Sequence, residues 1–321
     1  MRARTKAVLK RNLTAYAFLS PNIAFFLVFT LVPVFFAALI SFYDWDLLRE
    51  PIWISLQNYR DLLGWSVQND NGGAAVRGAS LFGTLRGLEP NDILFWRYLG
   101  NTIFFMIGIP FNIVLSLMVA MLVNQKLRGM IFFRTVFFLP VVASLIACSI
   151  LWRWIYNPEF GILNYALNAL RVPTFRWLSD PNLVKPAIIA MQIWKGFGYN
   201  MLLYLAGLQG IPERYYDAAA VDGARWFQRF WHITLPMLSA TTFFIVIMSV
   251  IQGFQVFGAV YIMTKGGPSG ASTPLVYYIY SYGFQWFRMG YASAIAWVLF
   301  ILTATFTWIQ WRYGERKVYY E

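Results

Sequence analysis

Long stretches without a charged side chain alternate with shorter polar segments along this chain. Four long ones are Asn12–Tyr43, Tyr98–Gln125, Phe230–Thr264 and Met289–Trp311, and a shorter one is Thr135–Trp152. A helix that crosses a bilayer needs about 20 mostly apolar residues, so each of the four long stretches is sufficient. Because the backbone finds no water inside a bilayer, helix is the conformation expected there.

This pattern predicts an all-α integral membrane protein. We expect six transmembrane helices, at Ala15–Phe42, Tyr98–Val123, Ile131–Tyr156, Val184–Leu208, Met237–Met263 and Tyr291–Trp311. Pro33, Pro110 and Pro140 lie in or near these spans and are expected to kink them. The sequence contains no repeat of roughly 20–50 residues and no soluble domain, so we treat residues 1–321 as one transmembrane domain.

Composition supports the membrane assignment. Hydrophobic residues make up 59% of the chain and charged residues only 12%, whereas a soluble domain carries about 25% charge. A net charge of +12 would suggest nucleic-acid binding in a soluble protein, but basic residues beside membrane spans are orientation signals. The basic N-terminus followed by a long apolar run is expected to be a retained first helix rather than a cleaved leader.

The distribution of charge predicts which loops face the cytoplasm. Lys and Arg are concentrated at the two termini and in residues 126–134 and 206–236, whereas no acidic residue falls within a predicted span. Positive charge is retained on the inside, so both termini are expected to be cytoplasmic. Residues 43–97 then form the first periplasmic loop, with an irregular middle at Gln68–Gly87. Phe160–Leu170 has the apolar spacing of a short amphipathic helix at the interface.

Two residue types that often carry chemistry each occur once. Cys148 lies inside an apolar stretch and has no second cysteine with which to pair. His232 has no cysteine nearby, which argues against a zinc site. We therefore expect no bound metal.

The segment 206–236 is the most distinctive polar stretch. Pro212 suits the first turn of a helix, and the positive end of the helix dipole favours Glu213 beside it. Gly223 suits a left-handed helix end. Small side chains at Ala218–Ala220 would let another protein approach the backbone closely. The alternative is an ordinary loop between two helices, but such a loop needs only a few residues.

The part of this segment from Asp217 to Pro236 resembles the "EAA" loop of permease subunits from binding-protein-dependent ABC importers. The resemblance rests on the small residues before Gly223 and on the Ile-x-Leu-Pro pattern at Ile233–Pro236. It extends over residues 10–312. Further matches to the carbohydrate-uptake branch, which includes the maltose, lactose and glycerol-3-phosphate permeases, are Trp154–Asn164, Ala206–Pro212, Thr264–Pro268 and Phe287–Ala292.

Two features depart from the family pattern. Asp217 stands where the family usually has Glu, which keeps the charge but shortens the side chain by one methylene. A contact between this carboxylate and an ATPase arginine would therefore have to shift. The insert Gly72–Gly87 also makes the first outside loop longer than is typical.

The resemblance implies a type I ABC importer permease whose cytoplasmic coupling helix docks on a separate ATPase. The residues it implicates in ATPase coupling are Asp217, Ala218, Ala219, Asp222, Gly223, Arg225, Ile233, Leu235 and Pro236. The implied partners are a second homologous permease, two ABC ATPase subunits and an extracytoplasmic substrate-binding protein, in the cytoplasmic membrane of a bacterium or archaeon. The chain has no GxxxxGK(S/T) motif, so we expect it to bind no cofactor, with ATP–Mg held by the ATPase subunits.

Polar residues within the fourth and fifth spans are candidates for a substrate pathway. They are Gln192, Trp194, Lys195, Gly196, Tyr199, Ser249, Gln252 and Gly253. An unpaired lysine at mid-bilayer costs roughly 2.5–3.5 kcal/mol, so Lys195 either faces a pathway or extends to the outer interface. The glycines beside it are expected to loosen the helix. Amides and aromatic faces suit a sugar, although hydrogen bonding between helices would equally explain buried Ser and Gln.

A membrane-embedded enzyme of glycan or lipid metabolism is the alternative from another class. Such an enzyme needs carboxylate pairs, metal ligands or an activated nucleophile near the membrane surface. The closest acidic pair outside the spans is Asp44 and Asp46, which we interpret as a feature of an interfacial loop. An ion channel is a further alternative, but the chain offers no obvious ring of charge.

Overall fold

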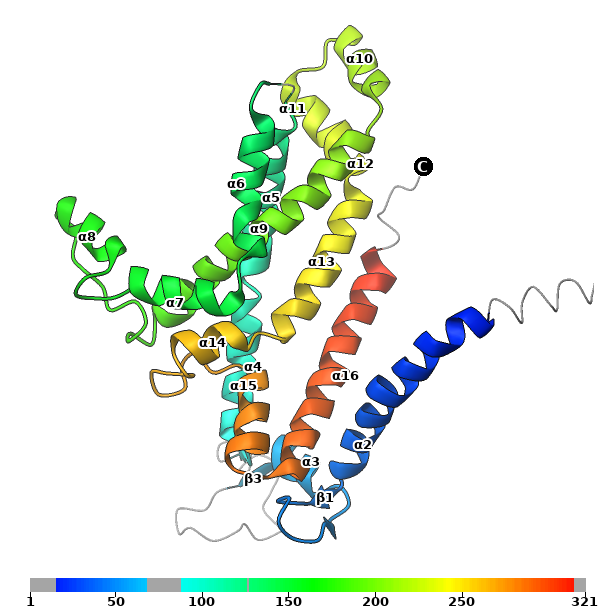
Figure 1. Ribbon diagram of the computed structural model, residues 1–321, viewed down its shortest axis with the longest axis vertical. Coiled ribbons are helices and arrows are strands. Elements are labelled where there is room, and N and C mark those ends of the chain that lie inside the picture. The colour runs from blue at the N-terminus through cyan, green and yellow to red at the C-terminus, as the bar shows by residue number, and fades with distance from the viewer. Residues whose placement is uncertain (1–15, 68–87, 126, 315–321) are drawn as a thin grey trace, which may run out of the picture. The chain divides into compact units, whose positions relative to one another are not determined.

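The structure, a computed structural model, describes residues 16–67, 88–125 and 127–314 (Figure 1). Helices dominate, as the apolar pattern predicts, and strands are limited within these ranges to two short antiparallel pairs. The chain divides into two compact units, one of residues 1–91 and 279–297 and the other of residues 92–278 and 298–321. The long helix α16 (Met289–Gly314) contributes to both.

The first unit begins with a strongly apolar helix over Tyr16–Ile40, close to the first expected span. Its most apolar window has no buried side chain, which is the surface that lipid contact requires. Inside it, a π-helical turn, η1 (Leu27–Leu31), comes directly before α2 (Val32–Ile40). Pro33 in the first turn of α2 has no N–H to donate, so the hydrogen-bond pattern changes at this point.

The segment after this helix is not wholly helical, which corrects the all-α expectation in detail. Its elements are β1 (Tyr43–Asp44), β2 (Ile52–Trp53), α3 (Gln57–Leu63), β3 (Trp65–Val67) and β4 (Leu88–Pro90), with β1 paired to β2 and β3 to β4. The Tyr43 and Trp53 rings meet edge to face across the first pair, 5.0 Å apart, and such cross-strand aromatic contacts stabilise short strands. The expected irregular stretch Gln68–Gly87 lies outside the described residues.

The second unit is built around one long helix. Its elements are α4 (Ile93–Phe105), α5 (Gly108–Val123), α6 (Met130–Val142), α7 (Leu145–Ile155), α8 (Ile162–Ala169), α9 (Val184–Gly210), α10 (Glu213–Val221), α11 (Trp226–Arg229), η3 (Phe230–Thr234), α12 (Leu235–Met237), α13 (Ser239–Phe254), α14 (Gly258–Met263) and the start of α15 (Leu275–Tyr280). Helix α9 packs along α5 and α6. Figure 1 shows α10 beyond the C-terminal end of α9, and α7 and α14 near its other end.

Two separate buried clusters stabilise this unit, one at each end of α9. The first contains Ile188 and Met191 of α9 with Val260 of α14. The second contains Met201 and Tyr204 of α9, together with apolar side chains of α5 and α13. The middle turns of α9 lie between the two clusters, and polar side chains occupy them.

Close helix contacts also explain why α9 stays regular where the sequence suggested a looser helix. A Cβ atom added to Gly198 would meet the backbone carbonyl oxygen of Phe137 in α6. The glycine therefore lets two helices approach, and α9 runs unbroken through Gly196 and Gly198. The expectation of a loosened helix at this point was wrong.

Irregular backbone occurs instead on the elements that face α9. Helices α6 and α7 meet at an angle of 97°, so the third predicted span is sharply bent rather than merely kinked. Pro140 is close to the end of α6, and Ala143 after it is extended. The fifth predicted span is interrupted as well, because α13 ends at Phe254 and α14 begins at Gly258.

The six-span count stays a prediction. Three helices of the described residues are long and apolar enough to cross a membrane, at Tyr16–Ile40, Ile93–Val123 and Met289–Gly314, or up to five if each bent pair is one span. Helix α9 is not among them, although it is 27 residues long. Two lysines and several side-chain amides lower its hydropathy.

Candidate functional site

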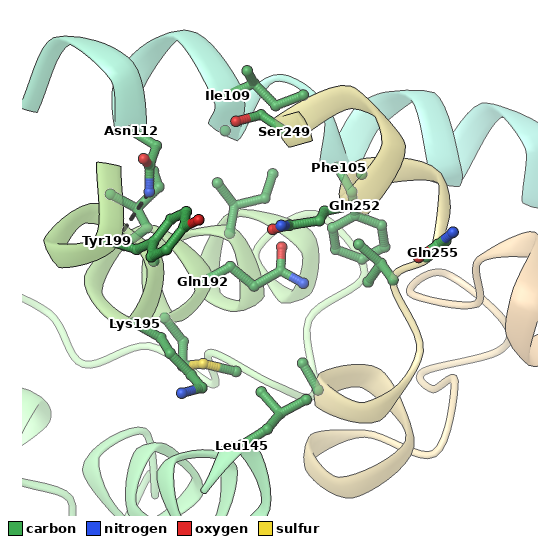
Figure 2. A pocket seen from close by; sticks show the side chains of 18 of the residues that line it. Phe105, Ile109, Asn112, Leu145, Gln192, Lys195, Tyr199, Ser249, Gln252 and Gln255 are labelled. Atoms are coloured by element: carbon green, nitrogen blue, oxygen red, sulfur yellow. Dashed lines mark hydrogen bonds between the residues drawn. The ribbon is translucent and has the colours of Figure 1, made fainter. Parts of the chain in front are cut away.

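A cavity of about 550 Å³ lies in the second unit, against the middle of α9. Its walls come from α4, α5, α9 and α13, from the bend between α6 and α7, and from the connection between α13 and α14 (Figure 2). The two interruptions in the helices therefore both face it. Irregular backbone is tolerated at membrane depth where it lines a cavity or is buried in protein, and this placement agrees with that rule.

One face of α9 supplies half of the polar side chains of the cavity. Gln192, Lys195, Tyr199 and Asn200 all line it. Gln192, Lys195 and Tyr199 are three and four residues apart and Asn200 is eight residues after Gln192, so all four lie toward one side of the helix. Figure 2 shows the amide of Gln252 on α13 directed toward that of Gln192. Neither amide has a hydrogen-bond partner among the described residues.

Lys195 lies at the edge of the cavity, but its ammonium group is already bonded. Nζ donates to the backbone oxygens of Pro140, Val141 and Ala143, at 3.2, 3.5 and 2.8 Å. These carbonyls form the C-terminal end of α6, where the helix dipole places partial negative charge. An ammonium has three donors, so the end of α6 occupies all of them. Neither sequence-based interpretation of Lys195 included this contact.

Sequence reasoning overlooked an asparagine pair that ties α5 to α9. Asn200 Nδ2 donates to Asn112 Oδ1 at 2.8 Å, and Asn112 Nδ2 donates to the Ile193 carbonyl at 3.3 Å. Ser116 Oγ contacts Asn112 Oδ1 at 3.3 Å and donates to the Phe197 carbonyl at 3.0 Å. The signal that could have revealed the pair was a carboxamide at one position in each of two apolar spans.

The structure brings together most of the residues that the sequence singled out for a pathway. Those that line the cavity are Gln192, Lys195, Gly196, Tyr199, Ser249, Gln252 and Gly253. Trp194 does not line it. Its ring meets that of Trp152 on α7, with 5.6 Å between centroids, and packs against the second buried cluster.

The described residues contain no group of three His, Cys, Asp or Glu side chains that could hold a metal ion. Cys148 is buried in α7. His232 Nδ1 is 2.9 Å from the backbone oxygen of Gln228, one helical turn earlier.

The other candidate region, α10 and the residues after it, ends at Gly223 as the sequence predicts and begins one residue later than predicted. Pro212 is the residue before the first turn, and Gly223 is left-handed with φ +74°. Ala224 N donates to Ala219 O at 2.8 Å and Gly223 N to Ala220 O at 3.1 Å, which is the hydrogen-bond pair of a Schellman helix end.

Helix α10 presents an open surface. None of its residues is buried, and Ala218 and Asp217 are exposed. It is attached to the unit by Tyr216, which packs against the second buried cluster and whose hydroxyl lies 3.0 Å from Thr234 Oγ1 in η3. Asp222 ends the helix and is also exposed.

The residues after Gly223 form more helix than the loop interpretation suggested. Arg225 precedes α11, and the helix then continues through η3 and α12 to Met237, where it bends by 63° into α13. Ile233 packs against the second buried cluster, and Leu235 and Pro236 form the first turn of α12. Much of the predicted loop 206–236 is therefore helical.

Comparison with known proteins gives the family. The sequence matches the family described as "Binding-protein-dependent transport system inner membrane component" over residues 79–317. The chain is 32% identical to the probable ABC transporter permease protein YesP of Bacillus subtilis (strain 168), over 99% of this chain and 96% of that protein. It is 38% identical to the lactose transport system permease protein LacF of Rhizobium radiobacter, over 71% of this chain and 78% of that protein.

A solved structure shares the fold. A chain of a bacterial ABC transporter involved in the import of the acidic polysaccharide alginate superposes with a TM-score of 0.75 at 23% identity, over 98% of this chain and 99% of that one. These findings confirm the expected permease fold and do not favour a membrane-embedded enzyme. The chain belongs to the family of inner-membrane components of binding-protein-dependent transport systems, whose members are transport subunits rather than enzymes.

Proposed function

We propose that this chain is the permease of an ATP-driven importer that carries a sugar across the cytoplasmic membrane. The observation that carries this proposal is the cavity. The unpaired amide of Gln192 lies on the same unbroken helix, α9, that leads to exposed α10, and the unpaired amide of Gln252 faces it from α13 (Figure 2). Relatives that transport lactose, and a structural neighbour that imports alginate, support a carbohydrate substrate.

The chemistry of the cavity suits a sugar. Gln192 and Gln252 each offer a donor and an acceptor, and the hydroxyls of Ser249 and Tyr199 offer both as well. A sugar hydroxyl also donates and accepts, so the two sets match. The Tyr199 side chain is 46% exposed, which leaves part of its ring available to the C–H face of a sugar.

Helix α10 is proposed to dock on the ATPase. Its alanines allow close approach, and Asp217, Asp222 and Arg225 supply charge for polar contacts at its surface and C-terminal end. The part of α9 from Lys195 to Gly210 is roughly 22 Å long at ~1.5 Å per residue. Because α9 is continuous over this distance, a displacement of α10 would be transmitted to the cavity wall.

The remaining assembly follows from what this chain lacks. With no GxxxxGK(S/T) motif it does not cradle ATP phosphates in that way, so ATP–Mg belongs to a pair of separate ABC ATPase subunits. A second homologous permease completes the pathway, and an extracytoplasmic binding protein delivers the sugar. Both termini and α10 face the cytoplasm. ATP and the loaded binding protein each favour the outward-facing state of an alternating-access cycle.

A cross-linking experiment on the assembled transporter tests this proposal. Cys148→Ser removes the only cysteine, after which Ala218→Cys places one on α10 and Tyr165→Cys places a control on α8, where Tyr165 is 78% exposed. We expect a thiol cross-linker to join Ala218→Cys, but not Tyr165→Cys, to the ATPase, in a complex that imports sugar only with ATP. The absence of any ATPase adduct, or uptake without ATP, would contradict the proposal.

A further inference from the structure

The charge of the cavity narrows the substrate class. We propose that this cavity takes an electrically neutral saccharide and discriminates against acidic or phosphorylated ones. The proposal rests on the proposed sugar-import function and goes beyond it, because relatives and neighbours include transporters of both kinds, such as those for lactose and for the acidic polysaccharide alginate.

The first step is to count the charged side chains that line the cavity. Among the described residues that line the cavity, Lys195 is the one charged side chain, and no Asp, Glu, Arg or His accompanies it. A lysine in a sugar site would ordinarily suggest an anionic ligand. The geometry of Lys195 argues against an anionic ligand in this cavity.

The second step is that the hydrogen-bond donors of the Lys195 ammonium group are already used within the protein. Its hydrogen bonds to Pro140, Val141 and Ala143 account for all three donors, and its charge faces the partial negative charge at the end of α6. Figure 2 shows the Lys195 side chain extending away from Gln192 and Gln252, toward the side of the cavity that Leu145 occupies. The other lysine of α9, Lys185, is also engaged, with Nζ 3.0 Å from Asn101 Oδ1 and 4.6 Å from the centre of the Phe104 ring.

The third step is what an acidic ligand would meet. A carboxylate accepts hydrogen bonds but donates none, so an amide oxygen of Gln192 or Gln252 that faces it would lose the donor that a neutral hydroxyl offers at the same place. Removing a charge from water without pairing it with an opposite charge is strongly unfavourable. A neutral sugar uses both the donors and the acceptors of these side chains and avoids that cost.

The test measures binding to the permease–ATPase complex without its binding protein, so that the cavity alone selects. Equilibrium dialysis would use radiolabelled pairs that differ only by oxidation of the C6 hydroxymethyl group to a carboxylate, glucose with glucuronate and galactose with galacturonate. We expect at least one neutral member to bind at least about tenfold more tightly than its acidic partner. Equal or tighter binding of the acids would overturn this inference and leave the import function standing.

Matched variants assign the selectivity to the cavity. Gln192→Ala should weaken binding of the neutral sugar, whereas Gln209→Ala, an exposed glutamine at the far end of α9, should not. Lys195→Met should leave the neutral-to-acidic ratio unchanged, and a ratio that moves several-fold would show that the ammonium contacts the ligand. If Lys195→Met does not fold, Gln192→Lys serves instead, since an added free ammonium should shift the ratio toward acids and an unchanged ratio would contradict the inference.

One result would contradict both the sugar-import function and the selectivity for neutral sugars, and it can be distinguished from the outcomes above. If the assembled transporter, with its binding protein, hydrolyses ATP but neither binds nor imports any of the sugars, neutral or acidic, both the sugar-import function and the inference fail.

Discussion

At the scale of single residues, Lys195 shows how a polar side chain in an apolar span can be structural and still border a site. Its ammonium group holds the last carbonyls of α6 at the point where the chain turns by 97°. The lysine therefore supports the bend that forms one cavity wall. Buried carbonyls left without a donor cost about 1–3 kcal/mol each.

Lys195→Met should accordingly destabilise the purified permease. The methionine keeps a similar length but leaves the oxygen of buried Pro140 without its donor, whereas Ala143 is exposed, and we expect a loss of roughly 1–3 kcal/mol. Thermal unfolding in detergent measures the effect, with Arg128→Met, at an exposed position between α5 and α6, as the control. An unfolding temperature equal to that of the wild type would mean that these hydrogen bonds do not support the bend.

Gly198 makes a second prediction at this scale. A methyl group there would meet the Phe137 carbonyl oxygen and the Val141 side chain, so Gly198→Ala must push α9 away from α6. Overpacking of this kind typically costs ~1–3 kcal/mol. Gly100→Ala in α4, where a Cβ meets nothing within 4 Å, is the matched control. Thermal unfolding of both variants should separate them, and equal stability would refute the close contact.

The sequence located most cavity residues because polarity in an apolar span is informative in itself. Trp194 does not line the cavity, because two positions after Gln192 a helix has turned to another face. Sequence reasoning overlooked Asn112 and Asn200, although they are polar positions of the same kind, and their pairing becomes visible only when α5 and α9 are side by side. Tertiary packing, rather than local propensity, decides these cases.

At the scale of elements, the ends of α10 were predictable and the bends were not. Proline at the start of a helix and glycine after it are local signals. Gly223 lies where expected, and Pro212 lies one position before the first turn in which it was expected. Pro140 correctly indicated a distortion, but the 97° turn also depends on extended Ala143 and on Lys195 from another helix. The gap between α13 and α14 has no comparable local signal. Gly258 at this gap fits closely against Leu145 of α7, and this contact between distant residues cannot be seen in the local sequence.

The left-handed end of α10 supplies an element-scale prediction. Gly223→Ala meets no neighbouring atom but must adopt φ +74°, a conformation that costs a residue with a Cβ about 1–2 kcal/mol. We expect the α10 end to unwind and ATP-driven uptake to fall severalfold, while the amount of protein in the membrane stays the same. Gly210→Ala at the end of α9 is also free of neighbours but has no positive φ, so its uptake should be unchanged. Equal uptake by the two variants would remove the basis for a coupling role of this turn.

At the scale of the whole molecule, the arrangement of α9 links the parts. Its first turns lie in one buried cluster, its last turns in the other, and its polar face borders the cavity between them. The Tyr216–Thr234 contact then joins α10 to the helix that leads into α13, which carries Gln252. Both polar walls of the cavity are therefore connected to α10, one through α9 and one through α13.

This connection makes the two glutamines a test of the assembled transporter. Gln192 and Gln252 converge from different helices on one space, so a single sugar should contact both (Figure 2). Each change to alanine removes about 1 kcal/mol of hydrogen bonding, which we expect to lower uptake by roughly fivefold. The double variant should lose less than the product of the two single effects, because groups that bind one ligand are coupled.

Measuring how far the binding protein stimulates ATP hydrolysis distinguishes lower uptake caused by weaker sugar binding from lower uptake caused by a loss of coupling between the ATPase and the permease. The stimulation should persist in Gln192→Ala and Gln252→Ala, because α10 is untouched in both, and it should fall in Gly223→Ala. If the glutamine variants instead lost ATPase stimulation together with uptake, the cavity residues would act on the conformational cycle and not on the sugar. If their effects simply multiplied in the double variant, the two amides would act independently of each other.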